Sequence, residues 1–236
     1  MSGSQQEQGA VFNIRLRDWK RMRIKLLTLN MHKGFTSFNR KFILHELREA
    51  IRGEGADIVC LQEVLGEHRE HSTRYEAWPT GSQYEFLADT IWPNFAYGQN
   101  AVYPAGHHGN ALLTKFPIST FANHDVSTRK QERRGLLHSV LETPYGAPEL
   151  HVVCAHLGLT ANQRWQQLNL LCDLIEQTVP EDAPLIVAGD FNDWWVKAHP
   201  LLQERAGLRE IFVEAYCQSA RSFPASRALA SPPSAT

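Results

Sequence analysis

Acidic and amide side chains follow two apolar, β-forming segments of this chain. Glu63 comes after the apolar run 57–61, and the motif Gly189–Asn192 (Gly-Asp-Phe-Asn) comes after the run 185–188. Both runs predict buried strands, so these polar groups should stand at strand ends. Mg²⁺ prefers oxygen ligands and keeps several waters, so one or two carboxylates suffice to hold it. The pattern predicts Glu63 as a metal ligand and metal-assisted hydrolysis of a phosphoester as the chemistry.

Asp190 and Asn192 are two residues apart, directly after their predicted strand. In extended backbone both side chains would point toward one site. A carboxylate there could bind the metal and orient or deprotonate the attacking water, while the amide donates to a phosphate oxygen. The alternative is an Asx turn that ends the strand, which Asp and Asn often form.

Asn30 and His156 end two further predicted strands. Asn30 could hold a metal-bound water or orient Glu63, although such a residue is also common in turns. His156 could donate a proton to a phosphate oxygen or stabilise its charge. The competing interpretation of His156 is a buried structural histidine with its hydrogen bonds satisfied.

Two other positions could bind phosphate. Arg134 precedes a predicted strand and could donate a bidentate fork, with solvation at the surface as the alternative. Asn110, beside Gly109, could donate through its amide. His107 and His108 could ligate a metal, but a Gly-His-His-Gly segment is more often a mobile loop.

Composition limits the class of protein. The chain has 236 residues, 43% of them apolar, and 24 basic against 25 acidic side chains, which gives a net charge of −1. This suits one large globular domain and argues against a strongly basic nucleic-acid-binding surface. The four cysteines lack the spacing of a zinc site or a disulfide framework, which favours buried thiols in a reducing cytoplasm. No apolar stretch is long enough to cross a bilayer, so we expect no stable membrane insertion.

Hydrophobic periodicity predicts strands and helices in mixed order. Hairpin-like neighbours alternate with helices, so two packed sheets with outer helices fit better than one doubly wound sheet. The expected strands are 23–30, 57–61, 95–98, 111–114, 136–141, 150–156, 185–188 and one around 211–213; the expected helices are 43–51, 84–91, 165–175 and 199–206.

The two ends of the chain differ in composition from its middle. Residues 1–21 begin rich in Gln, Ser and Gly and then become basic, and residues 225–236 are mostly Ala, Ser and Pro. We expect both ends to be flexible tails around one domain over residues 22–224.

Taken together, these motifs resemble the endonuclease/exonuclease/phosphatase (DNase I-like) superfamily, in a bacterial branch related to sphingomyelinase-like members. The motifs are Thr28–Asn30, Gln62–Glu63, Gly109–Leu113, Arg133–Gly135, His156–Gly158 and Gly189–Asn192. The resemblance implies a four-layered α/β sandwich that hydrolyses phosphodiesters or phosphomonoesters with Mg²⁺, or Mn²⁺ as an alternative. It implies Glu63 and Asn30 at the metal, and Asp190, Asn192 and His156 around the water and phosphate. Nucleic acids, phospholipid headgroups and small phosphates are the substrates that this superfamily implies.

The chain departs from the family pattern after its last motif. Family members end with two strands that carry an Asp and a Ser-Asp-His motif, whereas here no Asp follows Asp193 and no His follows His199. We therefore expect the last strands to be missing and one sheet to have an uncovered face or edge. Because loss of a general acid or base costs about 10²- to 10⁴-fold in rate, the alternative function is an inactive fold that retains metal or phosphate binding.

Overall fold

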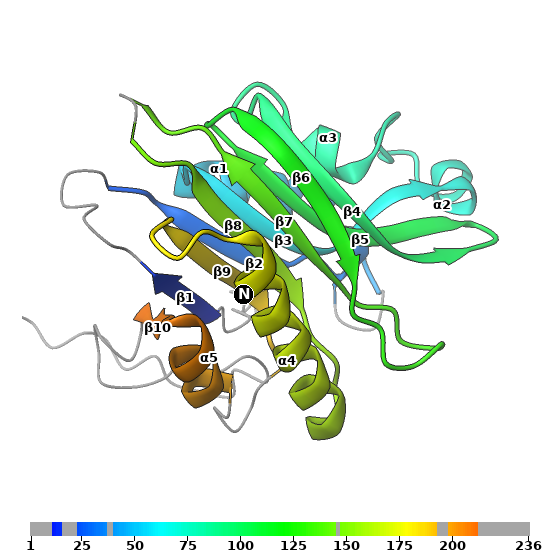
Figure 1. Cartoon of the computed structure of the whole chain (residues 1–236). Coiled ribbons are helices and arrows are strands. Elements are labelled where there is room, and N and C mark those ends of the chain that lie inside the picture. The colour runs from blue at the N-terminus through cyan, green and yellow to red at the C-terminus, as the bar shows by residue number, and fades with distance from the viewer. Residues whose placement is uncertain (1–10, 16–22, 37–39, 145–146, 193–197, 212–236) are drawn as a thin grey trace, which may run out of the picture.

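Two mixed β-sheets pack face to face in the computed structural model, with helices on both outer sides (Figure 1). The structure describes residues 11–15, 23–36, 40–144, 147–192 and 198–211. Within them one sheet has six strands in the order β10-β1-β9-β8-β7-β6, and the other has four in the order β2-β3-β5-β4. The predicted four-layered sandwich is therefore confirmed.

The elements have the following bounds. The six-stranded sheet contains β1 (Val11–Arg15), β6 (Ile118–Asp125), β7 (Gly135–Leu141), β8 (Leu150–His156), β9 (Leu185–Asp190) and β10 (Arg209–Glu210). The four-stranded sheet contains β2 (Leu26–Asn30), β3 (Ile58–His68), β4 (Asn94–Tyr103) and β5 (Gly106–Thr114). The helices are the 3-10 helix η1 (His32–Gly34), α1 (Leu44–Glu54), α2 (Arg69–Arg74), α3 (Gln83–Ala88), α4 (Ala161–Thr178) and α5 (Ala198–Ala206).

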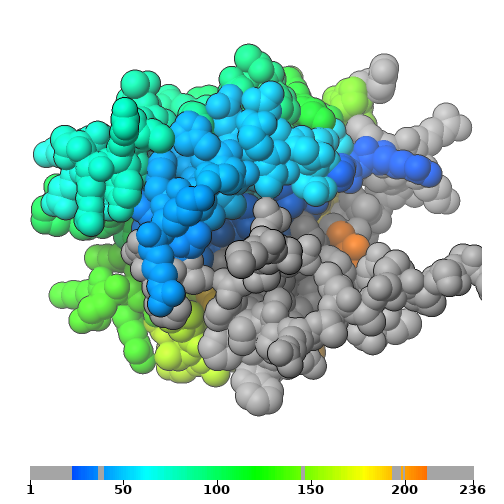
Figure 2. Space-filling model, turned by 180° about the vertical axis from the view of Figure 1, so that it is seen from behind, coloured from blue at the N-terminus to red at the C-terminus, as the bar shows by residue number. Residues whose placement is uncertain are grey.

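Three apolar layers hold these elements together. The helices α4 and α5 pack on β7, β8 and β9 through the first layer, and the second lies between the two sheets. The third lies between the four-stranded sheet and the helices α1 and α3. Seen from behind, residues 23–54 (blue shades) occupy the middle of the surface (Figure 2). No helix within the described ranges combines the length and the hydrophobicity needed to span a membrane.

Parallel pairing brings the predicted site segments to one edge of each sheet. The strands β2 and β3 are parallel, with Asn30 opposite Gln62, and β8 and β9 are parallel, with His156 opposite Asp190. The carboxyl ends of paired parallel strands lie at the same edge of a sheet. Because β2 also contacts β9 across the sandwich, the two edges face each other.

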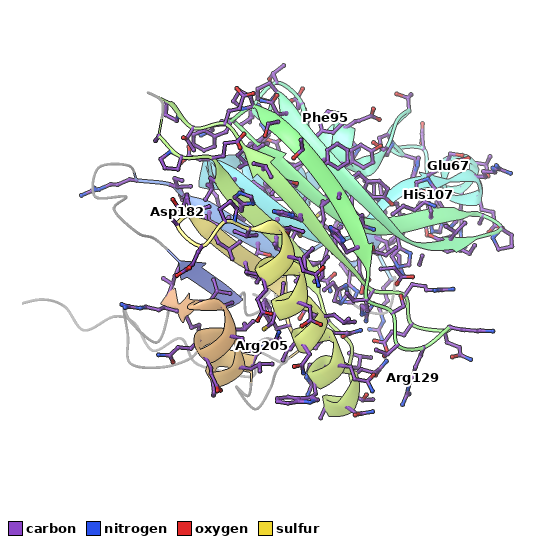
Figure 3. The ribbon with its side chains drawn as sticks, viewed as in Figure 1. Glu67, Phe95, His107, Arg129, Asp182 and Arg205 are labelled. Atoms are coloured by element: carbon purple, nitrogen blue, oxygen red, sulfur yellow. The ribbon has the colours of Figure 1, made fainter. Side chains whose placement is uncertain are left out.

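The hairpin regions differ from the sequence prediction. The strand β6 was not predicted, because most of its side chains are exposed and show no apolar alternation. The segment expected as a mobile Gly-His loop is instead the start of β5, where His107 pairs with Glu67 of β3 (Figure 3). Backbone pairing therefore places His107 and His108 in the sheet, although their composition favours a loop.

The expectation of a flexible lead-in over residues 1–21 is wrong for Val11–Arg15. These residues form β1, which pairs with β9 on one side and with β10 on the other. The strand β1 thus lies along one edge of β9, where its backbone continues the ladder of hydrogen bonds. The tail 225–236 and most of the strand expected around 211–213 fall outside the described residues.

The glycine before Asp190 is required by the backbone. Gly189 has a φ of +152°, and a Cβ there would lie 1.9 Å from the carbonyl oxygen of Ala155 in β8. We expect Gly189→Ala to lower the free energy of unfolding by about 3 kcal/mol or more, through strain and overpacking. Gly53→Ala in α1 is the control, because no atom lies within 4 Å of its Cβ position. That change should be neutral or stabilise the protein by about 0.5–1 kcal/mol in urea unfolding. Equal effects of the two substitutions would contradict the prediction.

Candidate active site

A β-bulge in β3 presents Glu63 at the edge of the four-stranded sheet. Leu61 pairs with Ala111 and Val64 pairs with Gly109, so Gln62 and Glu63 together face only Asn110. Such bulges turn a side chain away from the regular alternation of a strand. Glu63 has a φ of +53°, a conformation that is uncommon outside glycine.

Two side chains from η1 face the carboxylate of Glu63. Its Oε2 lies 3.8 Å from His32 Nδ1 and 4.0 Å from Lys33 Nζ. Both distances exceed a direct hydrogen bond, so neither group occupies the oxygen lone pairs of the carboxylate. Burial acts to raise the pKa of Glu63, but nearby His156, Lys33, His32 and His108 together lower it below its usual value. The carboxylate is therefore ionised at neutral pH.

Asn30 holds Asp190 in the facing sheet. The Asn30 amide donates from Nδ2 to Asp190 Oδ2 at 3.2 Å, while its Oδ1 accepts from the backbone N–H of His32 at 3.1 Å. His156 Nε2 lies 3.9 Å from the same Asp190 oxygen. The predicted partner of Asn30 was Glu63, whereas its amide hydrogen bond joins it to Asp190. Asn30 thus orients the carboxylate of the opposite sheet.

The Asx turn considered for the Gly-Asp-Phe-Asn motif is present. Asp190 Oδ1 accepts from the backbone N–H of Asn192 at 3.0 Å. The Asn192 side chain donates from Nδ2 to the carbonyl oxygen of Leu157 at 2.9 Å, and Arg134 Nε donates to the same oxygen at 3.1 Å. One backbone carbonyl thus joins Asn192 and Arg134 at the end of β8, next to His156.

Glu63 and Asp190 lie around the same histidine. Both carboxylates act to raise the pKa of His156, as does Glu132. Burial and the neighbouring Arg134 act in the opposite direction and prevail, so the pKa of His156 is lowered to about 4. His156 is therefore a neutral imidazole at pH 7 in the free protein, able to donate one N–H hydrogen bond without carrying charge.

Asn110 does not lie where a phosphate could reach its amide protons. The residue is fully buried, and its Nδ2 donates to the carbonyl oxygens of Gly135 at 2.9 Å and Cys154 at 3.2 Å. Both protons are thus used to tie β5 to the other sheet. The expectation that Asn110 donates to phosphate is wrong in this structure, because the sheet-to-sheet contacts take its donors.

Backbone strain is concentrated in this region. Of the five described non-glycine residues with positive φ, four belong to the site: His32, Lys33, Glu63 and Asn192. Such conformations cost about 1–3 kcal/mol each and cluster at functional sites. The distribution supports a functional assignment for this rim independently of the residue types.

Four charged or titratable residues of the site were not favoured from the sequence, although one of them, His108, was considered as a metal ligand and set aside as part of a mobile loop. His32 and Lys33 directly follow the Asn30 strand end, which is the signal that could have found them. His108 lies two residues before Asn110 in β5, so the strand period places both on one face. Burial lowers its pKa to about 4, with Lys33, His156 and Arg134 adding to the shift and Glu63 opposing it. Glu132, two residues before Arg134, is the fourth.

The donor set fits a hard cation such as Mg²⁺. In the described part of the chain no three His, Cys, Asp or Glu side chains are grouped closely enough to hold a metal by themselves. Zinc sites are usually built from such groups, whereas Mg²⁺ needs one or two carboxylates and takes its other ligands from water and substrate phosphate. The ionised Glu63 supplies one such carboxylate.

The buried histidines make the stability depend on pH. The pKa values of His108, His138 and His156 are lowered to about 4, in each case mainly by burial. His138 also lies 3.0 Å (Nε2) from Nδ1 of His151. These side chains titrate near 6.5 when unfolded, so between pH 6.5 and 4 the unfolded state binds more protons. The free energy of unfolding therefore decreases as the pH falls through that range.

We expect the free energy of unfolding to be lower at pH 5 than at pH 7 by about 1–2 kcal/mol per histidine. Carboxylates with lowered pKa values, such as Glu63, lose their contribution only below about pH 4.5, so this interval reports on histidines. Urea unfolding at the two pH values measures the difference, and proton NMR titration of the histidine rings identifies the groups. An unchanged free energy would contradict the prediction.

Residues 27–231 match the model of the Endonuclease/Exonuclease/phosphatase family. The protein YbhP of Escherichia coli (strain K12) is 53% identical over 200 residues, which cover 85% of this chain and 79% of that protein. YbhP of Shigella flexneri aligns with the same identity and coverage.

Solved structures show the same fold at low sequence identity. An endonuclease/exonuclease/phosphatase from Beutenbergia cavernae superimposes with a TM-score of 0.60 and 21% identity over 72% of this chain and 48% of that chain. This chain thus spans about half the length of that protein. Sphingomyelinase C from Streptomyces griseocarneus superimposes with a TM-score of 0.55 and 18% identity, over 77% of this chain and 69% of that chain.

Proposed function

Because this chain belongs to the endonuclease/exonuclease/phosphatase family, we propose that it is a Mg²⁺-dependent phosphoesterase. The family includes phosphoesterases and nucleases, and the reaction we propose is hydrolysis of a phosphodiester or phosphomonoester by an activated water. The observation that carries the proposal is the meeting of the ends of β2, β8 and β9 with the bulge of β3. There Glu63 and Asp190, from opposite sheets, both act to raise the pKa of His156.

Each proposed role follows from a contact. Glu63 and the amide oxygen of Asn30 would hold the metal, with Mn²⁺ able to replace Mg²⁺. When bound, the ion supplies a Lewis acid and a charge clamp at the phosphate. Asp190, oriented by Asn30, accepts a hydrogen bond from the attacking water or takes its proton. The Asn30 amide and the backbone N–H of Asn192 already hold the carboxylate of Asp190 in one orientation, so its side chain can act without a large rearrangement.

In this proposal His156 and Arg134 donate hydrogen bonds to the substrate phosphate. His156 donates one N–H bond to a phosphate oxygen, and an approaching phosphate dianion would raise the pKa of this histidine. Arg134 donates from the guanidinium N–H groups that protein carbonyls and Glu132 leave available. Asn192 positions Arg134 through their shared bond to Leu157 O.

Turnover of the purified full chain tests the proposal directly. Bis(4-nitrophenyl) phosphate and 4-nitrophenyl phosphate serve as generic diester and monoester probes, each assayed with Mg²⁺ and with EDTA. Hydrolysis that is faster than in Mg²⁺ without the protein, and that is lost in EDTA, would support the proposal. The relative rates with the two probes would show which class of ester is preferred. Phosphate or metal binding without turnover would instead support the alternative of an inactive binding fold.

A further inference from the structure

Glu132, in the loop between β6 and β7, accepts hydrogen bonds from three groups. Its Oε1 accepts from Arg134 Nη2 at 2.8 Å and from the backbone N–H of Leu159 at 3.2 Å. Its Oε2 accepts from Gln163 Nε2 at 2.7 Å. All three partners are donors, so the position requires a carboxylate rather than an amide.

The first turn of α4 holds Glu132 in place. Gln163 is the third residue of a capping box, where its Oε1 accepts from the Thr160 backbone N–H at 3.2 Å and from the Thr160 hydroxyl at 2.6 Å. The Gln163 amide therefore cannot flip to present its oxygen to Glu132 without losing the helix cap. The start of α4 thus determines where the carboxylate of Glu132 lies.

Glu132 in turn limits the positions open to Arg134. The guanidinium donates to Leu157 O through Nε and to Glu132 through Nη2, and its side chain is 12% exposed. A free arginine side chain populates many rotamers, and holding it in one of them before binding reduces the entropy that binding must overcome. Nη1 also donates to the carbonyl oxygen of Arg133 at 3.4 Å, so of the five guanidinium N–H groups one on Nη1 and one on Nη2 remain available to a ligand.

We propose that Glu132 is a positioning residue that holds the Arg134 guanidinium ready to bind the substrate phosphate. This inference rests on the proposed phosphoesterase function. The chain of contacts runs from the α4 cap through Gln163, Glu132 and Arg134 to the carbonyl oxygen that Asn192 also contacts. Glu132 acts on the phosphate only through Arg134.

A double-mutant cycle on the full chain tests this dependence. The variants are Glu132→Gln, Arg134→Ala and the two combined, and the probe is inorganic phosphate, with its Kd measured by isothermal titration calorimetry at constant ionic strength. We expect Glu132→Gln and Arg134→Ala each to weaken binding about tenfold, the effect of losing one charge-assisted contact. The double variant should bind no more weakly than Arg134→Ala alone.

Two further variants separate positioning from general effects. Asp125→Asn neutralises an exposed carboxylate that pairs with Arg133 at 3.5 Å, and it should leave the phosphate Kd within about twofold. Glu132→Asp keeps the charge but is one methylene shorter, so it should recover part of the affinity lost in Glu132→Gln. If Glu132→Gln fails to fold, Glu132→Asp still tests the inference. Circular dichroism shows whether Glu132→Asp is folded.

The hydrolysis assay gives an independent readout. With bis(4-nitrophenyl) phosphate, Glu132→Gln should raise KM more than it lowers kcat, since it weakens binding of the phosphate in both ground and transition states. A purely structural role would lower the fraction of active protein and so change kcat alone.

Three outcomes would overturn the inference. In the first, Glu132→Gln binds phosphate as tightly as Asp125→Asn does. In the second, its effect adds fully to that of Arg134→Ala, which would show that Glu132 acts independently of Arg134. In the third, the unaltered protein neither binds phosphate nor hydrolyses the esters, and Arg134→Ala has no effect. That last result would refute the proposed function itself, so the two failures are distinguishable.

Discussion

Replacing Glu63 by glutamine should remove nearly all Mg²⁺-dependent hydrolysis by this protein. The carboxylate is ionised and 19% exposed, and its neighbours His32 and Lys33 stand beyond hydrogen-bond distance. A neutral amide there loses the main charge that attracts the cation. Metal stabilisation of a transition state is worth several kcal/mol, so kcat/KM should fall by about 10³-fold.

Glu67→Gln is the matched control for Glu63→Gln. Glu67 lies in the same strand, is exposed, and pairs with Arg69 at 3.0 Å away from the site (Figure 3). Its replacement should leave activity within about twofold. Calorimetric titration with Mg²⁺ gives a second measurement, in which only Glu63→Gln should lose binding. Full activity of Glu63→Gln would exclude this residue as the metal ligand.

Asp190→Asn should reduce kcat by about 10²- to 10⁴-fold while Mg²⁺ binding changes much less. The proposed role of Asp190 is to orient or deprotonate the attacking water, and losing a general base costs rate in that range. Asparagine keeps the size of the side chain and can still accept from the Asn192 backbone N–H, as Asp190 does at 3.0 Å. The fold should therefore persist, and circular dichroism checks this.

The control for Asp190→Asn is Asp182→Asn in the turn before β9 (Figure 3), at the opposite end of that strand from Asp190. Its rate should match that of the unaltered protein. The pH dependence adds a second criterion, since an Asp acting as base gives a rate that falls at acidic pH. If Asp190→Asn kept the rate of the unaltered protein and the same fall in rate at acidic pH, the base would have to be another residue.

Much of the site could be predicted because its residues follow apolar, β-forming runs. Glu63, His156 and Asp190 each come after or end such a run, a local pattern that predicts a buried strand. Parallel pairing of β2 with β3 and of β8 with β9 then places these segments side by side. The strand β3 continues to His68, however, so Glu63 lies at a bulge within the strand and not at its end. Backbone pairing also orders Val11–Arg15 and His107, which were expected to be flexible.

Asn110 illustrates why residue types alone did not determine roles. As a polar residue beside a glycine it resembles a ligand-binding group, yet its two amide protons bond to Gly135 and Cys154 across the sandwich. A buried amide without hydrogen-bond partners would destabilise the folded state, so its N–H groups donate to the nearest carbonyl oxygens. Which carbonyls are near depends on how the two sheets pack.

Local sequence patterns predict the class of fold, the apolar runs that polar groups follow, and the family to which the chain belongs. These properties can be predicted because the alternation of apolar and polar residues is visible within short segments. The bulge that turns Glu63, the pairing of Asn30 with Asp190, and the support of Arg134 by Glu132 depend instead on tertiary contacts. Such details require contacts like that between Asn30 and Asp190, which are 160 positions apart in the chain, and only the packing of one sheet on the other brings such residues within reach.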